Sequence, residues 1–310
     1  MLLKEVINIY ELLDDSNVDG QKVKDYLLSI KDAQIEVKTL GGDKGSTDFV
    51  RILIPGKNGK SQGGDKPTLG VLGRLGGIGA RPEQNGFVSD GDGALVALSV
   101  AAKLLDMKNK GDDLEGDVIV STHICPDAPT QPHDPVPFMG SPVDMKTLND
   151  EECRGDFDAI LSIDTTKGNR VINHKGFSIS PTVKEGYILR VSEDILDVMA
   201  TTTGKNPHVF PLTIQDITPY GNDLYHINSI LQPATATDAP VVGVAITTET
   251  SVAGCATGAT SPVSIEECAR FVLEVSKMYT KGSLDFYDKE EYKQIIEKYG
   301  SMEKFQTLGK

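Results

Sequence analysis

The segment from Val88 to Leu105 constrains the fold more than any other part of the sequence. It starts with the turn Val-Ser-Asp-Gly-Asp-Gly and continues with small or apolar residues that only Ser99 and Lys103 interrupt. These residues fall on almost every side of a helix, so the helix must be covered all round rather than lie on a surface. We expect Asp92 to cap its first turn with the side-chain carboxylate.

Short apolar or alternating segments, typical of strands, recur between segments with helical spacing. This order predicts a three-layer α/β/α fold with a mostly parallel, mixed sheet. We expect one α/β domain over residues 1–310, with a core of about 1–282 and a C-terminal helix and tail at 283–310. The expected strands are 35–40, 48–55, 68–73, 117–122, 159–164, 183–191, 209–214 and 241–246. The expected helices are 2–13, 21–30, 94–105, 195–202, 224–231, 265–279 and 289–308.

The composition argues against membrane and nucleic-acid partners. Hydrophobic residues make up 39% and charged residues 25%, and the net charge of −14 would repel a phosphate backbone. The longest apolar run, 94–102, is too short to span a bilayer, and residues 1–5 lack a secretory pattern. The four cysteines, at 125, 153, 255 and 268, show no CxxC spacing. We therefore expect a cytoplasmic protein with reduced thiols.

Polar residues follow several of the expected interior strands. Arg74, His123, Asp127 and Asp164 stand at or just after such strands. In parallel α/β folds, ligands lie beyond the carboxyl ends of the strands. The polar strand ends therefore predict the place of a site.

Three aspartates, Asp90, Asp127 and Asp164, form the main candidate constellation. Carboxylates from separate strand ends suit one oxygen-ligated divalent cation, with Zn, Mn and Mg as candidates. His123 and Cys255 are possible further ligands, although His123 also suits a packing role and Cys255 a bystander thiol. A single aspartate at a strand end commonly serves a turn or a cap, so a chain without any metal is the open alternative.

The glycine-rich loop Gly73-Arg-Leu-Gly-Gly-Ile-Gly79 does not fit a nucleotide-binding motif. A dinucleotide fingerprint leads directly into a helix, whereas Pro82 and the residues after it predict a loop. Such a loop allows a close approach of backbone to a ligand. Arg74 and Arg81 beside it are candidates for binding an anionic group such as a carboxylate.

The order of these features resembles the zinc-dependent exopeptidases, especially the bacterial glutamyl and leucyl aminopeptidase-like branch. The resemblance covers most of residues 1–280 and is closest to an uncharacterised prokaryotic family, the domain of unknown function 1177. It implies a zinc-exopeptidase-like fold of the phosphorylase/hydrolase-like type, without the inserted lid domain. It also places the bridging aspartate of the family on Asp90 and a later aspartate ligand on Asp164.

At the other positions the sequence departs from the pattern of that family. The paired glutamates, general base and ligand, fall on Pro126 and Asp127, and the two histidine ligands fall on Arg74 and near Cys255. Pro126 cannot accept a proton as a general base must, and a fixed cation at Arg74 competes with a metal ion. We therefore expect a degenerate metal site.

Two functions remain open from the sequence. In the first, the chain is a homo-oligomeric binding protein whose remodelled, non-catalytic site takes a small anionic or peptide-like molecule. In the second, it is a divalent-metal-dependent peptidase or amidohydrolase with an atypical acidic metal site. The sequence leaves undecided whether the protein is an enzyme.

Overall fold

The computed structural model describes residues 1–134, 136–226, 229–252 and 256–309. In this part of the chain a nine-stranded sheet has the order β1-β2-β4-β3-β7-β11-β9-β10, with β8 paired to β11, and β5 pairs separately with β6. The strands are β1 (Gln34–Gly42), β2 (Gly45–Ile54), β3 (Leu69–Gly73), β4 (Val118–Ile124), β5 (Thr130–Gln131), β6 (Phe138–Met139), β7 (Ala159–Thr165), β8 (Gly176–Ile179), β9 (Val183–Lys184), β10 (Tyr187–Ile188) and β11 (Val241–Thr247).

The middle of the sheet is parallel and fully covered. Strands β4, β3, β7 and β11 are neighbours that run in the same direction, and every residue in them is buried. The β1–β2 hairpin joins β4 antiparallel, and β8 and β9 join β11 antiparallel. The carboxyl ends of the four central strands therefore meet at one edge of the sheet.

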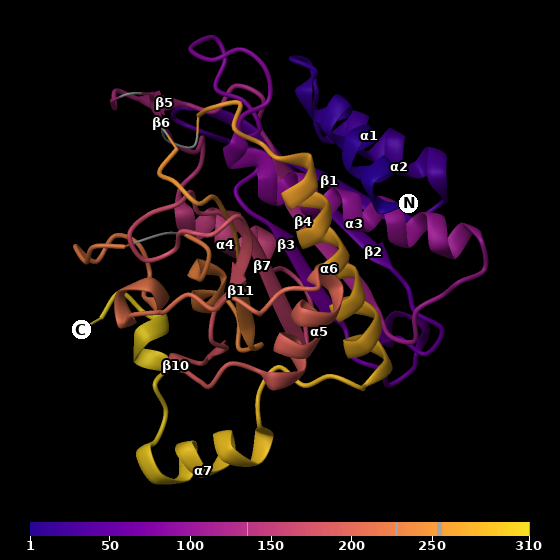
Figure 1. Cartoon of the computed structure of the whole chain (residues 1–310), viewed down its shortest axis with the longest axis vertical. Helices are drawn as coiled ribbons and strands as arrows, with labels where there is room; N and C mark the ends of the chain where they lie inside the picture. Colours follow the sequence, from indigo (N-terminus) through magenta and orange to yellow (C-terminus); the bar gives the residue numbers. More distant parts are fainter. Residues whose placement is uncertain (135, 227–228, 253–255, 310) are drawn as a thin grey trace.

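Helices cover both faces of this sheet, which makes the fold a three-layer α/β structure (Figure 1). On one face α3 packs against α1 and α6, and α5 packs against α6. On the other face a smaller core lies beneath α4 and short 3-10 turns at 214–217 and 232–235. The helices are α1 (Leu2–Asp14), α2 (Gly20–Ile30), α3 (Asp92–Asn109), α4 (Met145–Glu152), α5 (Glu193–Thr203), α6 (Pro262–Lys281) and α7 (Lys289–Tyr299).

The expected buried helix is α3, which is covered along most of its length. Gly93 allows its first turn to press against the sheet, because a Cβ atom there would lie 2.1 Å from the carbonyl oxygen of Arg74 and 2.4 Å from that of Ile163. The prediction that Asp92 caps the helix is wrong. A 3-10 turn over Ser89–Gly91 leads straight into the helix, so Asp92 already lies inside it and its carboxylate makes tertiary contacts instead.

Several predictions near the C-terminal half also differ from the structure. The strand expected at 183–191 is two short strands around a turn, in which Glu185 has a φ of 46°. Residues 209–214 form no named strand, because Pro211 removes a backbone donor in the middle of the segment. The described residues of 224–231 are not helical, and the last helix ends at Tyr299 rather than near 308. Helix α4 and strand β8 were not predicted.

None of the described helices combines the length and the apolar character that crossing a bilayer requires.

Candidate functional site

The carboxyl ends of the central strands bring polar side chains to one face of the sheet. Side chains alternate between the two faces along a strand. Leu72 and Ala245 belong to the smaller core on the α4 side, so the residues two positions later, Arg74 and Thr247, share that face. The same alternation from Ile160 places Asp164 there as well. We call this surface the α4 face.

Arg74 is the central cation of the α4 face, and its exposed fraction is 0%. Its Nη1 donates to Glu152 Oε2 on α4, and its Nη2 donates to Met145 Sδ at 3.2 Å. A buried charge requires a partner of this kind, because an unpaired one is very costly to desolvate. The guanidinium is thus held by the protein itself.

Glu152 and Asp164 are the two buried carboxyl groups beside this guanidinium. Burial raises the pKa of Glu152 to about 7, with Arg74 opposing the rise and Asp164 adding to it. Burial also raises the pKa of Asp164, although Ser229 Oγ donates to its Oδ2 at 2.6 Å. Strongly shifted groups at a strand edge are typical of functional sites.

His123 lies on the same face but uses both ring nitrogens for internal contacts. Its Nε2 accepts from the backbone N–H of Gly76 at 2.9 Å, so its proton lies on Nδ1, which donates to Thr47 Oγ1 at 2.8 Å. Burial, together with the charge of Arg74, lowers the pKa of His123 to about 3. The imidazole is thus neutral with both nitrogens engaged, and metal ligation by His123 stays a prediction.

Asp90 lies in the 3-10 turn before α3, and Asp127 lies in the segment after β4. Asp90 is 7% exposed, and its Oδ2 faces Gly77, where a Cβ atom would lie 3.5 Å away. Asp127 is exposed, and Cys125 Sγ donates to its Oδ1 at 3.8 Å.

Asp92, next to Asp90, is engaged in a buried contact of its own. Its Oδ1 accepts from Thr260 Oγ1 at 2.6 Å, and its Oδ2 lies 3.4 Å from Lys167 Nζ. Burial raises the pKa of Asp92 against these contacts. These contacts explain why Asp92 is buried at the start of α3.

Among the described residues, no group of three or more His, Cys, Asp and Glu side chains is placed to hold a metal ion. The described donors therefore do not fit a two-metal centre. Cys255, the remaining candidate ligand, lies outside the described residues. Metal binding by Asp90, Asp127 and Asp164 stays a prediction.

Arg81, the second candidate for an anionic ligand, contacts backbone in the described chain. Its Nη1 donates to the carbonyl oxygen of Pro126 at 3.1 Å and its Nη2 to that of Asp14 at 2.9 Å. These contacts join the glycine-rich loop to the first helix and to the segment after β4. Anion binding by Arg74 and Arg81 stays a prediction, and both side chains have protein partners.

Several polar atoms on the α4 face have no hydrogen-bond partner within the described residues. They include Arg74 Nε, Glu152 Oε1 and Thr247 Oγ1, and also Asn149 Oδ1 on the inner side of α4. A buried polar atom without a partner costs about 1–3 kcal/mol, and such atoms are rare in folded proteins. These atoms could take polar contacts from groups beyond the described residues.

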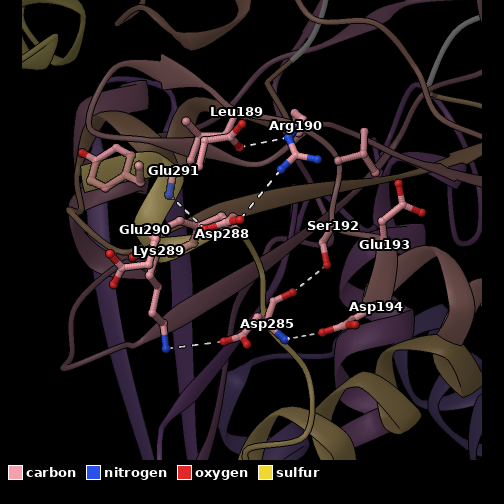
Figure 2. Close-up of a pocket in the computed structure, with 13 residues that line it drawn as sticks. Leu189, Arg190, Ser192, Glu193, Asp194, Asp285, Asp288, Lys289, Glu290 and Glu291 are labelled. Carbon is pink, nitrogen blue, oxygen red and sulfur yellow. Dashed lines mark hydrogen bonds and ion pairs between the residues drawn. The ribbon is translucent and has the colours of Figure 1, made fainter. Parts of the chain in front are cut away.

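A cleft of about 530 Å³ lies elsewhere, between the start of α7 and residues 189–194. Figure 2 shows that its charged groups face one another. Arg190 lies 2.9 Å from Glu291 and 3.9 Å from Asp288, and Lys289 lies 3.4 Å from Asp285. The charged groups of this cleft already pair with one another, and the cleft lies far from the ends of the central strands (Figure 1). We therefore take the α4 face as the candidate site.

Sequence reasoning found Arg74, His123 and Asp164 but missed their neighbours. Glu152 lies on α4, whose few apolar residues give only a weak helical periodicity. The sequence feature that could have predicted this helix is Asp144, which accepts from the N–H of Thr147 as an N-cap. Two further residues approach the cluster from a loop. Burial, with the nearby charge of Asp164, raises the pKa of Tyr220 to about 12, and the ring of His226 lies 4.2 Å from that of Tyr220.

Comparisons with known proteins agree with the fold. A family model described as "Protein of unknown function (DUF1177)" matches residues 38–309. No protein with a curated description matches the chain.

Two solved structures share the fold at low sequence identity. A tomato leucine aminopeptidase mutant is 13% identical with a TM-score of 0.53, and the match covers 88% of this chain and 61% of that one. The bottromycin maturation enzyme BotP in complex with Mn is 10% identical with a TM-score of 0.51, and the match covers 88% of this chain and 71% of that one. This chain thus spans about three fifths of the aminopeptidase.

Proposed function

This chain belongs to the DUF1177 family of proteins of unknown function, and we propose that it binds a small peptide-like molecule on the α4 face without a two-metal centre. The fold that it shares with a leucine aminopeptidase supports a peptide-like ligand, because an aminopeptidase acts on peptides. The α4 face differs from a metal site because it already contains a fixed cation.

The observation that carries this proposal is the buried ion pair between Arg74 and Glu152. In a metal site, carboxylates balance the charge of the ion. Here a guanidinium already stands beside Glu152 and Asp164, and its charge lowers the pKa of both carboxyl groups against the effect of burial. A second cation at this place would be repelled by the first.

The unpartnered polar atoms around Arg74 support a ligand with hydrogen-bonding groups. A peptide-like molecule carries both N–H donors and carbonyl acceptors, which are what such atoms require.

Metal content and binding together test this proposal. The purified protein is analysed for Zn, Mn and Mg, and a set of di- and tripeptides is then screened by ligand-observed NMR before and after treatment with a chelator. We expect binding that the chelator leaves unchanged. Chelator-sensitive hydrolysis of any peptide or amide would overturn the proposal in favour of a metal-dependent peptidase or amidohydrolase.

For assembly we propose a homo-oligomer formed through α7. Helix α7 projects from the body (Figure 1) and has no buried residue. Its residues Tyr292, Ile295, Ile296 and Tyr299 recur at helical spacing; Tyr292 packs against Tyr187 and Tyr287, Ile295 and Ile296 are half-buried, and Tyr299 is 76% exposed. Light scattering of the wild type and of Ile296→Lys tests this, with a monomer in the wild type as the contradicting result. A cytoplasmic location, which the free thiols of the three described cysteines support, belongs to the same proposal.

A further inference from the structure

A cavity of about 370 Å³ lies between α4, Tyr220 and the C-terminal residues 306–308. We call it the α4 pocket. It adjoins the charged cluster, because Met145 lines the pocket and its sulfur accepts from Arg74. Tyr220 lines it from the other side and responds to the charge of Asp164. The pocket thus extends the α4 face towards the end of the chain.

We propose that the α4 pocket binds an uncharged amide whose N–H donates to Asn149 Oδ1. This inference rests on the proposed binding of a peptide-like ligand and names the group of the ligand that is recognised. It makes Asn149 a specificity-determining residue that no sequence motif indicated.

The first support is the state of Asn149 itself. The residue is 3% exposed and lines the pocket, and its Oδ1 has no hydrogen-bond partner in the described part of the chain. It stands between Met145 and Glu152 at positions i, i+4 and i+7, which is one side of α4. Since this acceptor has no partner among the described residues and its side chain borders an open volume, a ligand in the pocket can supply the missing donor.

The second support is the charge of the lining. Lys146 and Asp150, the two charged residues in the lining, pair with each other on α4. The other residues around the pocket are neutral. Met145, Pro219, Ala236 and Leu308 provide apolar contact area, and the hydroxyl and amide side chains are those of Asn149, Tyr220, Thr235, Gln306 and Thr307. Small-molecule sites have this mixture of apolar lining and a few placed polar groups, and the volume is near the lower end of their range.

The third support is that the C-terminal wall of the pocket is fixed by hydrogen bonds. Gln306 Nε2 donates to the carbonyl oxygens of Ala234 and Thr237, each at 3.0 Å. These bonds hold residues 306–308 against the turn at 232–235. The pocket is therefore a built cavity rather than a gap beside a loose tail.

The test uses the full chain and N-acetyl-L-leucine methylamide as the probe. Its dissociation constant is measured by NMR titration beside that of the fully N-methylated analogue, which has no N–H donor. We expect the analogue to bind about tenfold more weakly, the value of one hydrogen bond to a buried acceptor.

Three variants locate this difference. Asn149→Leu has a similar size but no acceptor, so binding of the probe should weaken about tenfold and the preference over the analogue should disappear. Asn149→Asp retains acceptor oxygens and should retain binding. Asn173→Leu, at an exposed asparagine between β7 and β8, is the matched control and should leave binding unchanged. Thermal unfolding confirms that each variant is folded.

The outcomes separate this inference from the function on which it rests. Suppose that the probe binds the wild type, that Asn149→Leu binds the probe as tightly, and that the wild type binds the N-methylated analogue as tightly. The α4 pocket inference is then wrong and the proposed function stands. If no peptide-like compound binds the wild type at all, both are wrong.

Discussion

Replacing Arg74 by Met should destabilise the protein because it leaves Glu152 buried without its cation. Arg74 is fully buried and donates to Glu152. Removing one partner of a buried ion pair costs about 3–5 kcal/mol. A chain of 310 residues has an unfolding entropy of about 0.65 kcal/mol/K, so this loss lowers Tm by roughly 5–8 °C.

The size of this effect should depend on pH. Beside Arg74 the pKa of Glu152 is about 7, and the guanidinium holds it lower than burial alone would. In Arg74→Met the pKa of Glu152 therefore rises further, and the carboxyl group takes up a proton in mildly acidic solution. A neutral carboxyl group is much less costly to bury. We expect the difference in Tm between wild type and variant to be largest near pH 8 and to shrink towards pH 6.

Circular dichroism is the suitable assay, because the chain has no tryptophan. The double variant Arg74→Met/Glu152→Leu removes both members of the ion pair and should recover part of the loss, since apolar replacements of buried ion pairs are often neutral, while Asp164 still lacks its neighbouring cation. Lys277→Met breaks an exposed pair with Glu274 and should cost less than about 1 kcal/mol. If Arg74→Met costs no more than Lys277→Met at pH 8, the assignment of the buried pair is refuted.

Three further predictions follow from single contacts. Thr247→Val removes a buried hydroxyl that has no partner among the described residues, so in urea unfolding it should be neutral or stabilising by up to about 1 kcal/mol. Thr165→Val instead loses a hydrogen bond to the carbonyl oxygen of Ser89 and should cost about 1–2 kcal/mol. Gly93→Ala should abolish the cooperative thermal transition, because its Cβ atom would overlap two carbonyl oxygens. His123 has a pKa of about 3 in the fold against 6.5 in the unfolded chain, so the unfolded state binds more protons between these values and stability falls as pH falls. His123→Leu should flatten this part of the stability curve measured by urea unfolding, and an unchanged slope would contradict the buried neutral imidazole.

The layers of this fold could be predicted because they depend on apolar patterns. Helix α3 and the four central strands are apolar on every side, and no arrangement other than a covered layer satisfies such segments. The parts that were wrong are irregular. In the region 209–231, Leu224 and Ile214 are about half exposed while Phe210, Ile217, Ile230 and Leu231 are buried, so the buried residues there do not follow the period of a helix or a strand.

The partners of the site could not be predicted for a related reason. Periodicity counts apolar residues, but the inner side of α4 buries Asn149 and Glu152. Glu152 is buried because Arg74, which is distant in the sequence, neutralises it. A contact of this kind forms only in the tertiary structure. The local sequence around 145–152 therefore has the pattern that is typical of an exposed, polar segment.

The three aspartates show why a strand end alone does not define a site. Asp164 and Thr165 are consecutive, so their side chains point to opposite faces of the sheet. Asp164 shares the α4 face with Arg74, while Thr165 donates to the carbonyl oxygen of Ser89, in the turn that carries Asp90. The turn with Asp90 is therefore attached to the other face. One strand end therefore makes two different sets of contacts, so the position of an aspartate at a strand end does not by itself show which groups it meets.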